Sequence, residues 1–100
     1  MIDKMKISQR RERRNKLEIY FDILNSIMQE GKSTSIVRPT RVQFLSNLSY
    51  DGLLKHLEEL KEKNLISIAN GIFLTDRGKK FLKDYERIHD FTERMGLEYL

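Results

Sequence analysis

Hydrophobic residues recur at three- and four-residue intervals in three stretches of this chain, and each stretch predicts an amphipathic helix. The first predicted helix begins between Ser8 and Arg13 and ends near Glu30, with Gly31 as the stop after its last turn. Upstream of Leu17 the hydrophobic stripe disappears, and the chain is polar on every side. The side chains predicted to face the core from this helix are Leu17, Tyr20, Phe21, Leu24, Ile27 and Met28.

A second region, from Pro39 to Ile66, predicts two short helices joined by a tight turn. The first of them begins with Thr40-Arg41-Val42-Gln43, which matches a capping box, and it ends at Ser46. We expect Val42 and Leu45 to face inward from this helix, because they lie three residues apart on one side of it.

The turn Asn47-Leu48 leads into the second helix of this pair, and Leu48 is expected to fill the gap between the two helices. Ser49 is a good N-cap residue, and Asp51 in the first turn suits the helix dipole. The helix is predicted from Tyr50 to Lys63, and Asn64 follows at a position that tolerates left-handed backbone. Its inward face holds Leu53, Leu57 and Leu60, with Leu54 at the edge.

Three short segments predict β-strands. Ser33–Val37 is rich in β-branched residues and is expected to pair with a later hairpin. That hairpin consists of Leu65–Ala69 and Ile72–Leu74, joined by Asn70-Gly71, which is the strongest two-residue hairpin signal. The hairpin is little more than its turn, so it forms a minimal wing.

Thr75 is the expected cap of a last helix, with Asp76 in its first turn. Large side chains then follow a heptad spacing at Phe81, Tyr85, Ile88, Thr92, Met95 and Tyr99. We expect the first turns to pack on the chain's own core and the later ones on a second copy, because an uncovered apolar seam is a liability. The alternative is that the whole seam packs on its own chain. The predicted dimer interface is Tyr85, Ile88, His89, Thr92, Met95 and Tyr99.

This order of elements predicts a mostly α (α+β) fold, a winged helix-turn-helix with a long C-terminal dimerisation helix. The length of 100 residues corresponds to one domain. We divide the chain into a basic N-terminal arm or helix extension (1–16), the winged helix-turn-helix domain (17–75) and the dimerisation helix (76–100).

The net charge of +4 is unevenly distributed. Residues 1–16 hold 7 of the 19 basic and 2 of the 15 acidic residues, so they carry +5 and the other 84 residues carry −1. An arm of this kind is suited to phosphate contact, and a solvated tail is the alternative. The arm residues predicted to bind DNA are Arg10, Arg11, Arg13 and Arg14.

In a helix-turn-helix, the N-terminal end of the second helix is presented to base edges in the major groove. The prediction therefore places Ser49, Tyr50, Asp51 and Lys55 at the bases, and a half-buried Tyr50 ring is the alternative for that residue. Arg38, Thr40 and Arg41 are predicted beside them, and the two arginines suit phosphates, which position a protein without reading sequence. Glutamates near the end of the helix repel phosphate, so we expect the helix to enter the groove end-on.

The residues argue against catalysis, and we predict no enzyme activity, no cofactor and no metal. The histidines, His56 and His89, are far apart, no carboxylate cluster shows metal-ligand spacing with them, and Gly78-Lys79-Lys80 lacks the glycine-rich loop of a phosphate cradle. Cysteine is absent, which excludes disulfides and thiol catalysis. No segment is apolar enough for a membrane span or a secretory signal, so we expect a cytoplasmic protein with no membrane partner. No ligand pocket is readable from the sequence, and we predict no small-molecule effector.

Three segments together resemble the archaeal small winged-helix DNA-binding proteins: TRVQFLSNLSY (40–50), KHLEELKEKNLI (55–66) and LTDRGKKFL (74–82). The resemblance implies a homodimer joined by an antiparallel coiled coil of the C-terminal helices. It also implies binding of double-stranded DNA in transcription regulation or chromosome organisation. Crenarchaeal viruses carry related small regulators, which leaves cellular and viral origin open. The chain departs from the pattern because its wing has no basic residue, and a protein-interaction module without DNA binding is the alternative function.

Overall fold

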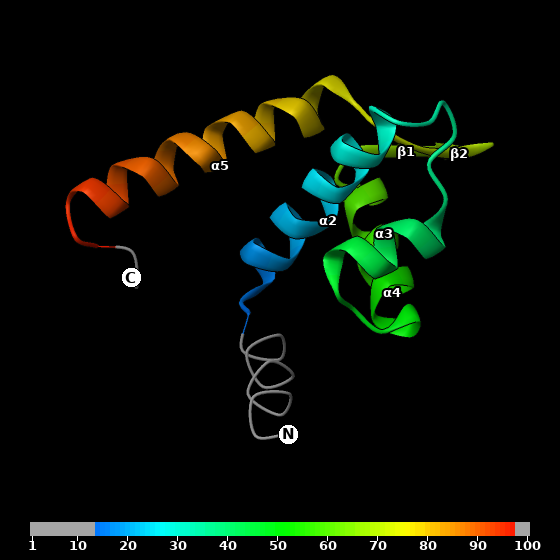
Figure 1. Cartoon of the computed structure of the whole chain (residues 1–100), viewed down its shortest axis with the longest axis horizontal. Helices are drawn as coiled ribbons and strands as arrows, with labels where there is room; N and C mark the ends of the chain where they lie inside the picture. Colours follow the sequence, from blue (N-terminus) through cyan, green and yellow to red (C-terminus); the bar gives the residue numbers. More distant parts are fainter. Residues whose placement is uncertain (1–13, 98–100) are drawn as a thin grey trace.

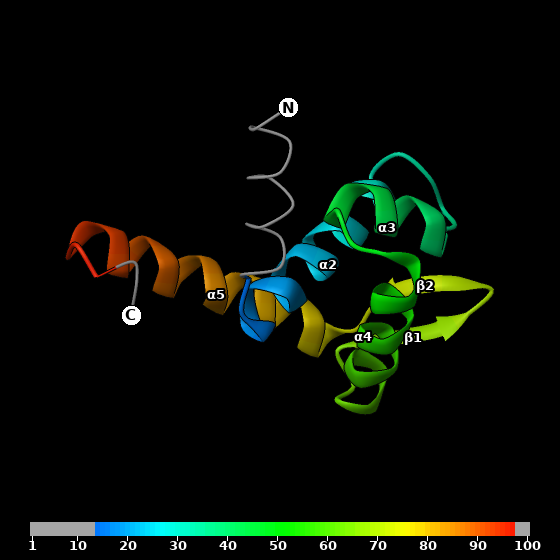
Figure 2. The same ribbon diagram turned by 90° about the horizontal axis from the view of Figure 1, so that it is seen from below.

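Residues 14–97 are described by the computed structural model of this chain. Helices α2, α3 and α4 and the two-stranded antiparallel sheet gather into a body, and α5 extends away from it (Figure 1). Seen from below, α5 leaves the body on the side opposite the hairpin (Figure 2). The mostly helical α+β fold class is confirmed. The elements are α2 (Lys16–Gly31), α3 (Pro39–Ser46), α4 (Tyr50–Glu62), β1 (Ile66–Ala69), β2 (Gly71–Leu74) and α5 (Asp76–Arg94).

Helix α2 begins later than predicted, because a capping box defines its start. Asn15 has extended backbone, its side-chain oxygen accepts from the Glu18 amide at 2.7 Å, and the Glu18 carboxylate accepts from the Asn15 amide at 3.0 Å. The predicted start between Ser8 and Arg13 is therefore wrong for this helix. Gly31 is its last helical residue and not the stop beyond it, since Lys32 is the C-cap.

The core forms where α2, α3, α4, the sheet and the first turns of α5 meet. Most of the predicted inward residues are buried or half-buried there, but Leu17 and Leu45 are 52% and 40% exposed, so these two predictions are wrong. Ile23 is fully buried and was missed, although it lies between two predicted stripe positions. The buried hydrophobic residues are Tyr20, Ile23, Leu24, Ile27, Val37, Val42, Leu53, Leu57, Leu60, Leu65, Ile66, Ile72 and Leu82.

The helix-turn-helix forms as predicted at its turn but not at its start. Helix α3 begins at Pro39, with Arg38 as an N-cap that makes no side-chain cap bond. Proline at the first helical position is pre-set for the helix, which places Thr40 inside the first turn where it cannot cap. The predicted capping box at Thr40 is therefore wrong. Asn47 adopts left-handed backbone (φ 63°) at the end of α3, and Leu48 packs against the core as expected.

The second helix of this pair matches its prediction closely. The Ser49 hydroxyl accepts from the Gly52 amide at 3.1 Å, which confirms Ser49 as the N-cap of α4. Leu53, Leu57 and Leu60 are buried, and Asn64 follows with left-handed backbone (φ 62°).

The wing is built differently from its prediction. Segment 33–37 forms no strand, and one backbone hydrogen bond, from the Ile72 amide to the Val37 carbonyl at 3.0 Å, ties it to β2. The register pairs Ala69 with Gly71, so the turn centres on Asn70 and is not a two-residue Asn-Gly turn. Gly71 has φ +140°, and a Cβ there would lie 3.0 Å from Ile36 Cγ2. The segment before α3 thus presses on the turn and fixes its glycine.

Helix α5 starts inside the body and ends outside it. The Thr75 hydroxyl accepts from the Gly78 amide at 3.0 Å, as predicted for the cap, and also donates to the Asn64 carbonyl at 2.6 Å. Gly78 is buried, and a Cβ there would clash with the Leu65 carbonyl oxygen. Glycine therefore allows α5 to approach the link between α4 and β1 closely, while the second half of α5 lies beyond the body (Figure 2).

Candidate nucleic-acid interface

The N-terminal tip of α4 projects as an exposed helix end. Tyr50 is 44% exposed, and Asp51 and Lys55 are exposed beside it. The Ser49 cap requires a small neighbour, because a Cβ on Gly52 would lie 2.9 Å from the Ser49 hydroxyl oxygen. The sequence thus holds the tip in one conformation while leaving its polar groups open to a ligand. Tyr50 makes no hydrogen bond among the described residues, so its hydroxyl is available for one.

The residues predicted at the start of α3 differ in their contacts within the chain. Arg38 and Thr40 are exposed at the start of the helix. Arg41 is half-exposed, and its Nε lies 3.4 Å from the Glu30 carboxylate of α2 and its guanidinium 5.4 Å from the Phe44 ring centroid. Half of the Arg41 side chain remains exposed beside this pair, so its guanidinium is accessible to a phosphate.

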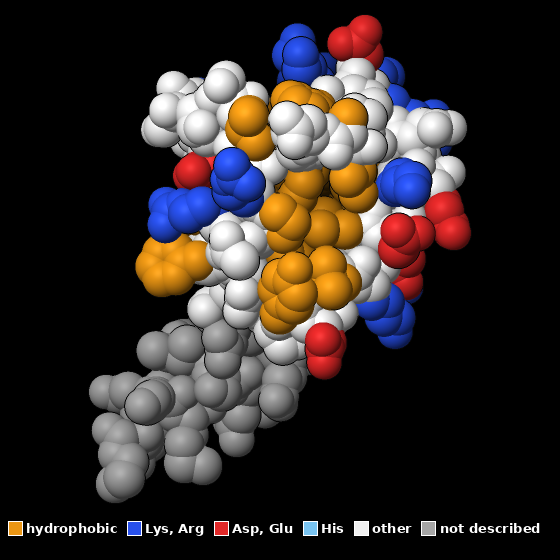
Figure 3. All heavy atoms as spheres, turned by 90° about the vertical axis from the view of Figure 1, so that its right-hand side faces the viewer, with side chains coloured by type: hydrophobic (Ala, Val, Ile, Leu, Met, Phe, Trp, Pro, Cys, Tyr) orange, Lys and Arg blue, Asp and Glu red, His pale blue; other side chains and the backbone are white. Residues whose placement is uncertain are grey.

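The surface over α3, α4 and the hairpin is more hydrophobic than the sequence indicated. Figure 3 shows hydrophobic side chains gathered along a groove on this face, with Lys, Arg, Asp and Glu side chains around it. Phe44 is 71% exposed and Leu54 is 41% exposed. Together with the wing, which has no basic residue, this face is suited to contacts beyond phosphates alone. The exposed large hydrophobic residues of these elements and of the segment before them are Ile36, Phe44, Leu45, Tyr50, Leu54, Ile68 and Phe73.

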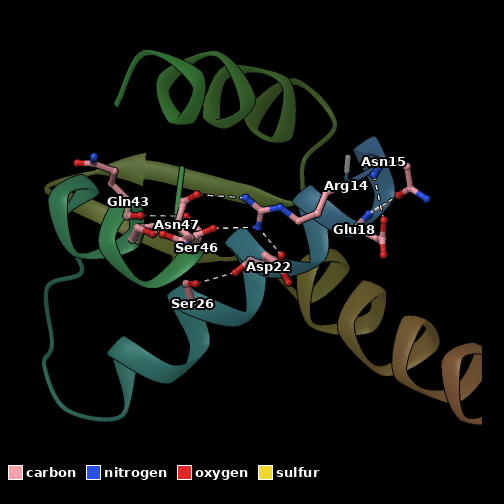
Figure 4. Close-up of polar contacts among 9 residues, drawn as sticks. Arg14, Asn15, Glu18, Asp22, Ser26, Gln43, Ser46 and Asn47 are labelled. Atoms are coloured by element: carbon pink, nitrogen blue, oxygen red, sulfur yellow. Dashed lines mark hydrogen bonds and ion pairs between the residues drawn. The ribbon is translucent and has the colours of Figure 1, made fainter. Parts of the chain in front are cut away.

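Arg14 was predicted to belong to a DNA-binding arm, and the structure uses it to join two helices instead. Its guanidinium forms an ion pair with Asp22 of α2 at 2.6 Å (Figure 4). It also donates to the carbonyl oxygens of Ser46 at 2.9 Å and Asn47 at 3.2 Å, which are end groups of α3. Only 15% of the side chain is exposed. Arg14 therefore satisfies helix-end carbonyls and fixes the turn before α4, and the prediction of a DNA contact at Arg14 is corrected.

Glu59 ties α2 to α4 on the other side of the body. Its carboxylate accepts from the Tyr20 hydroxyl at 2.7 Å and lies 3.1 Å from His56 Nδ1. The hydrogen bonds from Tyr20 and His56 and the nearby Lys16 ammonium lower the pKa of Glu59 to about 2, from an ordinary value of 4.5. Burial, together with Glu59, raises the pKa of Tyr20 to about 12. These contacts give His56 a structural role, because it contacts both Glu59 and the Tyr20 ring.

The predicted dimer residues divide into two groups. Tyr85 stacks on Phe21 of its own chain, with ring centroids 4.3 Å apart, and burial raises its pKa with help from the nearby Glu18 and Asp22 carboxylates. Ile88 and Met95 are 63% and 59% exposed. Beside them, Phe91 is 50% exposed. Thr92 is half-buried and donates to the exposed His89's carbonyl, so the side chains available to a second copy are those from residue 88 onward.

His89, Asp90 and Glu93 form a group that sequence spacing missed. Their potential ligand atoms all lie within 4.8 Å of one another on α5, and Glu93 lies four residues after His89 and three after Asp90, the spacings at which side chains meet on a helix. The statement that no carboxylate has metal-ligand spacing with a histidine is corrected to this extent. All three side chains are exposed, and the group supports no metal site by itself.

Arg10, Arg11, Arg13 and Tyr99 lie outside the described residues. No helix among residues 14–97 has the length and hydrophobicity needed to cross a membrane. A family model described as winged helix-turn-helix matches residues 13–93, which span the body and nearly all of α5. No curated protein matches this chain.

Proposed function

Because this chain belongs to the winged helix-turn-helix family, we propose that it binds double-stranded DNA as a homodimer and acts in transcription regulation or chromosome organisation. The observation that carries the proposal is the exposed tip of α4, with Ser49 capping it and Tyr50, Asp51 and Lys55 open beside it. A helix N-terminus of this kind suits base edges in the major groove, where lysine pairs with guanine acceptors.

The tip also limits how the helix approaches DNA. Glu58 and Glu62 are exposed further along α4, so the helix side repels phosphates while its end does not. Arg38 is the N-cap of the preceding helix and Arg41 lies within it, and both are proposed phosphate contacts, with the arm residues Arg10, Arg11 and Arg13. Arg14 is left out of this set because its guanidinium is bound within the body.

Self-association through α5 is the second part of the proposal. Ile88, Phe91 and Met95 are at least half exposed beyond the body, and a second copy would bury them. An antiparallel pair of these second halves carries two α4 tips, one from each subunit. We further propose that the protein is not an enzyme and needs no cofactor.

The test of DNA binding is selection of bound fragments from random duplex DNA, followed by titration of the selected sequence. Lys55→Ala should relax base preference at one position of each half-site, at a cost of about 1–3 kcal/mol for a specific base contact. Lys61→Ala is the matched control, because it removes an exposed lysine from the other end of α4. Equal enrichment of all sequences by the wild type would contradict base reading.

A protein-interaction module is the second candidate, and the hydrophobic groove over α3, α4 and the hairpin favours it (Figure 3). Titration with random-sequence duplex at low salt separates the two functions. Binding that weakens as salt is added supports DNA binding, because counterions are released from phosphates. Absence of binding at low salt supports the interaction module instead.

A further inference from the structure

A basic cleft lies on the first half of α5, at the place where this helix meets the end of α2 and β2. Its volume is about 630 Å³, and its basic lining residues are Lys79, Lys80, Lys83 and Arg87. Asp76 and Asp84 line it as well, so the lining carries a net charge of +2. The proposed function uses none of these residues.

The charges in the basic cleft are only partly neutralised. Lys80 Nζ lies 3.1 Å from Asp84, and Arg87 lies 3.9 Å from the same carboxylate. No carboxylate among residues 14–97 lies within 4.0 Å of the Lys79 or Lys83 ammonium. The side chains of Lys80 and Arg87 are 75% and 78% exposed. Lys80 and Arg87 thus share the Asp84 carboxylate, and Lys79 and Lys83 have no carboxylate within 4.0 Å among the described residues.

The arrangement of these cations selects an extended anion over a small one. Lys80, Lys83 and Arg87 follow one helix face at three- and four-residue spacing, so they span about 10 Å along α5. Their charged groups lie at the ends of flexible side chains on an open surface, and they do not converge on one point. A linear polyanion meets such a row with several charges at once, and duplex DNA carries one charge per about 1.7 Å of its axis.

The basic cleft is also well separated from the α4 tip. Arg77 Nε donates to the Lys63 carbonyl at 3.0 Å, which places the start of α5 at the far end of α4. Helix α4 has 13 residues, and a helix of that length measures about 20 Å. A contact here would lie outside the region that the α4 tip reaches.

We propose that the basic cleft is a second phosphate-binding surface for duplex DNA, an inference that rests on the proposed function. It extends the DNA contact of each subunit beyond the α4 tip. Lys79 and Lys83 carry the contact, because neither is held in an ion pair within the described residues 14–97.

The test compares K79Q/K83Q with K61Q/K63Q, two variants that each lose two positive charges at exposed positions. Binding of a random-sequence duplex by the full chain is measured over a series of salt concentrations. In K79Q/K83Q the slope of log Kobs against log salt should fall by about two, because each lysine contacts one phosphate. The slope of K61Q/K63Q should equal that of the wild type.

A second measurement uses the wild type alone, so it does not depend on how a variant folds or associates. Chemical acetylation with and without duplex, read by mass spectrometry, should show that DNA protects Lys79 and Lys83 but not Lys61 and Lys63. Equal slopes for the two variants, or equal acetylation with and without DNA, would overturn the proposal that the basic cleft binds DNA. The proposed function would still stand if the wild type binds duplex. Wild-type protein that binds no duplex would overturn both, and binding of an acidic protein by the basic cleft would then identify the other partner class.

Discussion

The two halves of α5 have the same hydrophobic spacing and opposite surroundings. In the first half, Leu82 is 2% exposed and Gly78 touches the backbone at Leu65. In the second half, Ile88 and Met95 are 63% and 59% exposed. The heptad pattern is continuous through both halves. It therefore predicts that this helix face is buried, but not whether the same chain or a second copy buries it. The difference separates residues that stabilise the subunit from residues available for assembly.

The largest expected effect comes from the buried half. Leu82→Ala should lower the free energy of unfolding by about 2–5 kcal/mol, because it leaves a cavity in the core. Chemical denaturation followed by circular dichroism measures this loss, which should be the same at every protein concentration. Ile88→Ala is the control from the exposed half, and its effect should vanish when the protein is diluted to the monomer. A concentration-independent loss of similar size for Ile88→Ala would erase the distinction between the halves.

The exposed half is tested by placing a charge on it. Ile88→Asp should weaken self-association at least about tenfold, which is 1.4 kcal/mol, because a carboxylate would be buried between the paired helices. Sedimentation velocity over a dilution series gives the dissociation constant. Lys61→Asp on the exposed end of α4 is the charge-changing control. A wild type that stays monomeric at high concentration would contradict the dimer, and with it the reading of this half as an interface.

Sequence succeeded where the physical cause was local. Ser49 and Thr75 were predicted as caps and are caps, because a hydroxyl and the amide three residues on are brought together by the helix itself. Asn64 was predicted at a left-handed position on the same basis. The leucine stripe of α4 was predicted because one helix face meets one core. The caps, the left-handed residue and the leucine stripe can all be predicted from residues within the same helix or next to it.

Sequence failed where the cause came from elsewhere in the fold. Segment 33–37 has strand-forming residues, but it makes one hydrogen bond with β2 and presses Ile36 against Gly71. Arg14 looks like part of a basic arm, yet its carbonyl partners lie more than thirty residues away. A charge run does not reveal which of its members a distant helix end will bind. The sequence therefore predicted the exposed tip of α4. It did not predict that Arg14 fixes the preceding turn, nor the hydrophobic groove over α3, α4 and the hairpin.

Arg14 offers a test of the body itself, the part of the molecule that covers the first half of α5. Arg14→Gln should lower the free energy of unfolding by about 1.5–3 kcal/mol, because a largely buried charged donor leaves Asp22 and two helix-end carbonyls without their bonds. Thermal or chemical unfolding measures the loss. The matched control is Arg38→Gln, an exposed arginine at the start of α3 for which a change within about 0.5 kcal/mol is expected. Equal effects of the two substitutions would show that Arg14 contributes only surface charge.

The smallest expected effect is the acid sensitivity of the body, which should leave the second half of α5 untouched. The pKa of Glu59 is about 2 in the folded chain against an ordinary value of 4.5, so its ionised form is favoured by folding. Its contribution is fully present above pH 4.5 and is lost as pH falls from 4.5 toward 2. The wild type should therefore lose more stability than Glu59→Gln over this interval, as measured by chemical denaturation at each pH. Glu62→Gln is the charge-matched control on the exposed side of α4. If Glu59→Gln and the wild type lose stability in parallel, the bond from the Tyr20 hydroxyl of α2 to the ionised Glu59 of α4 does not stabilise the body.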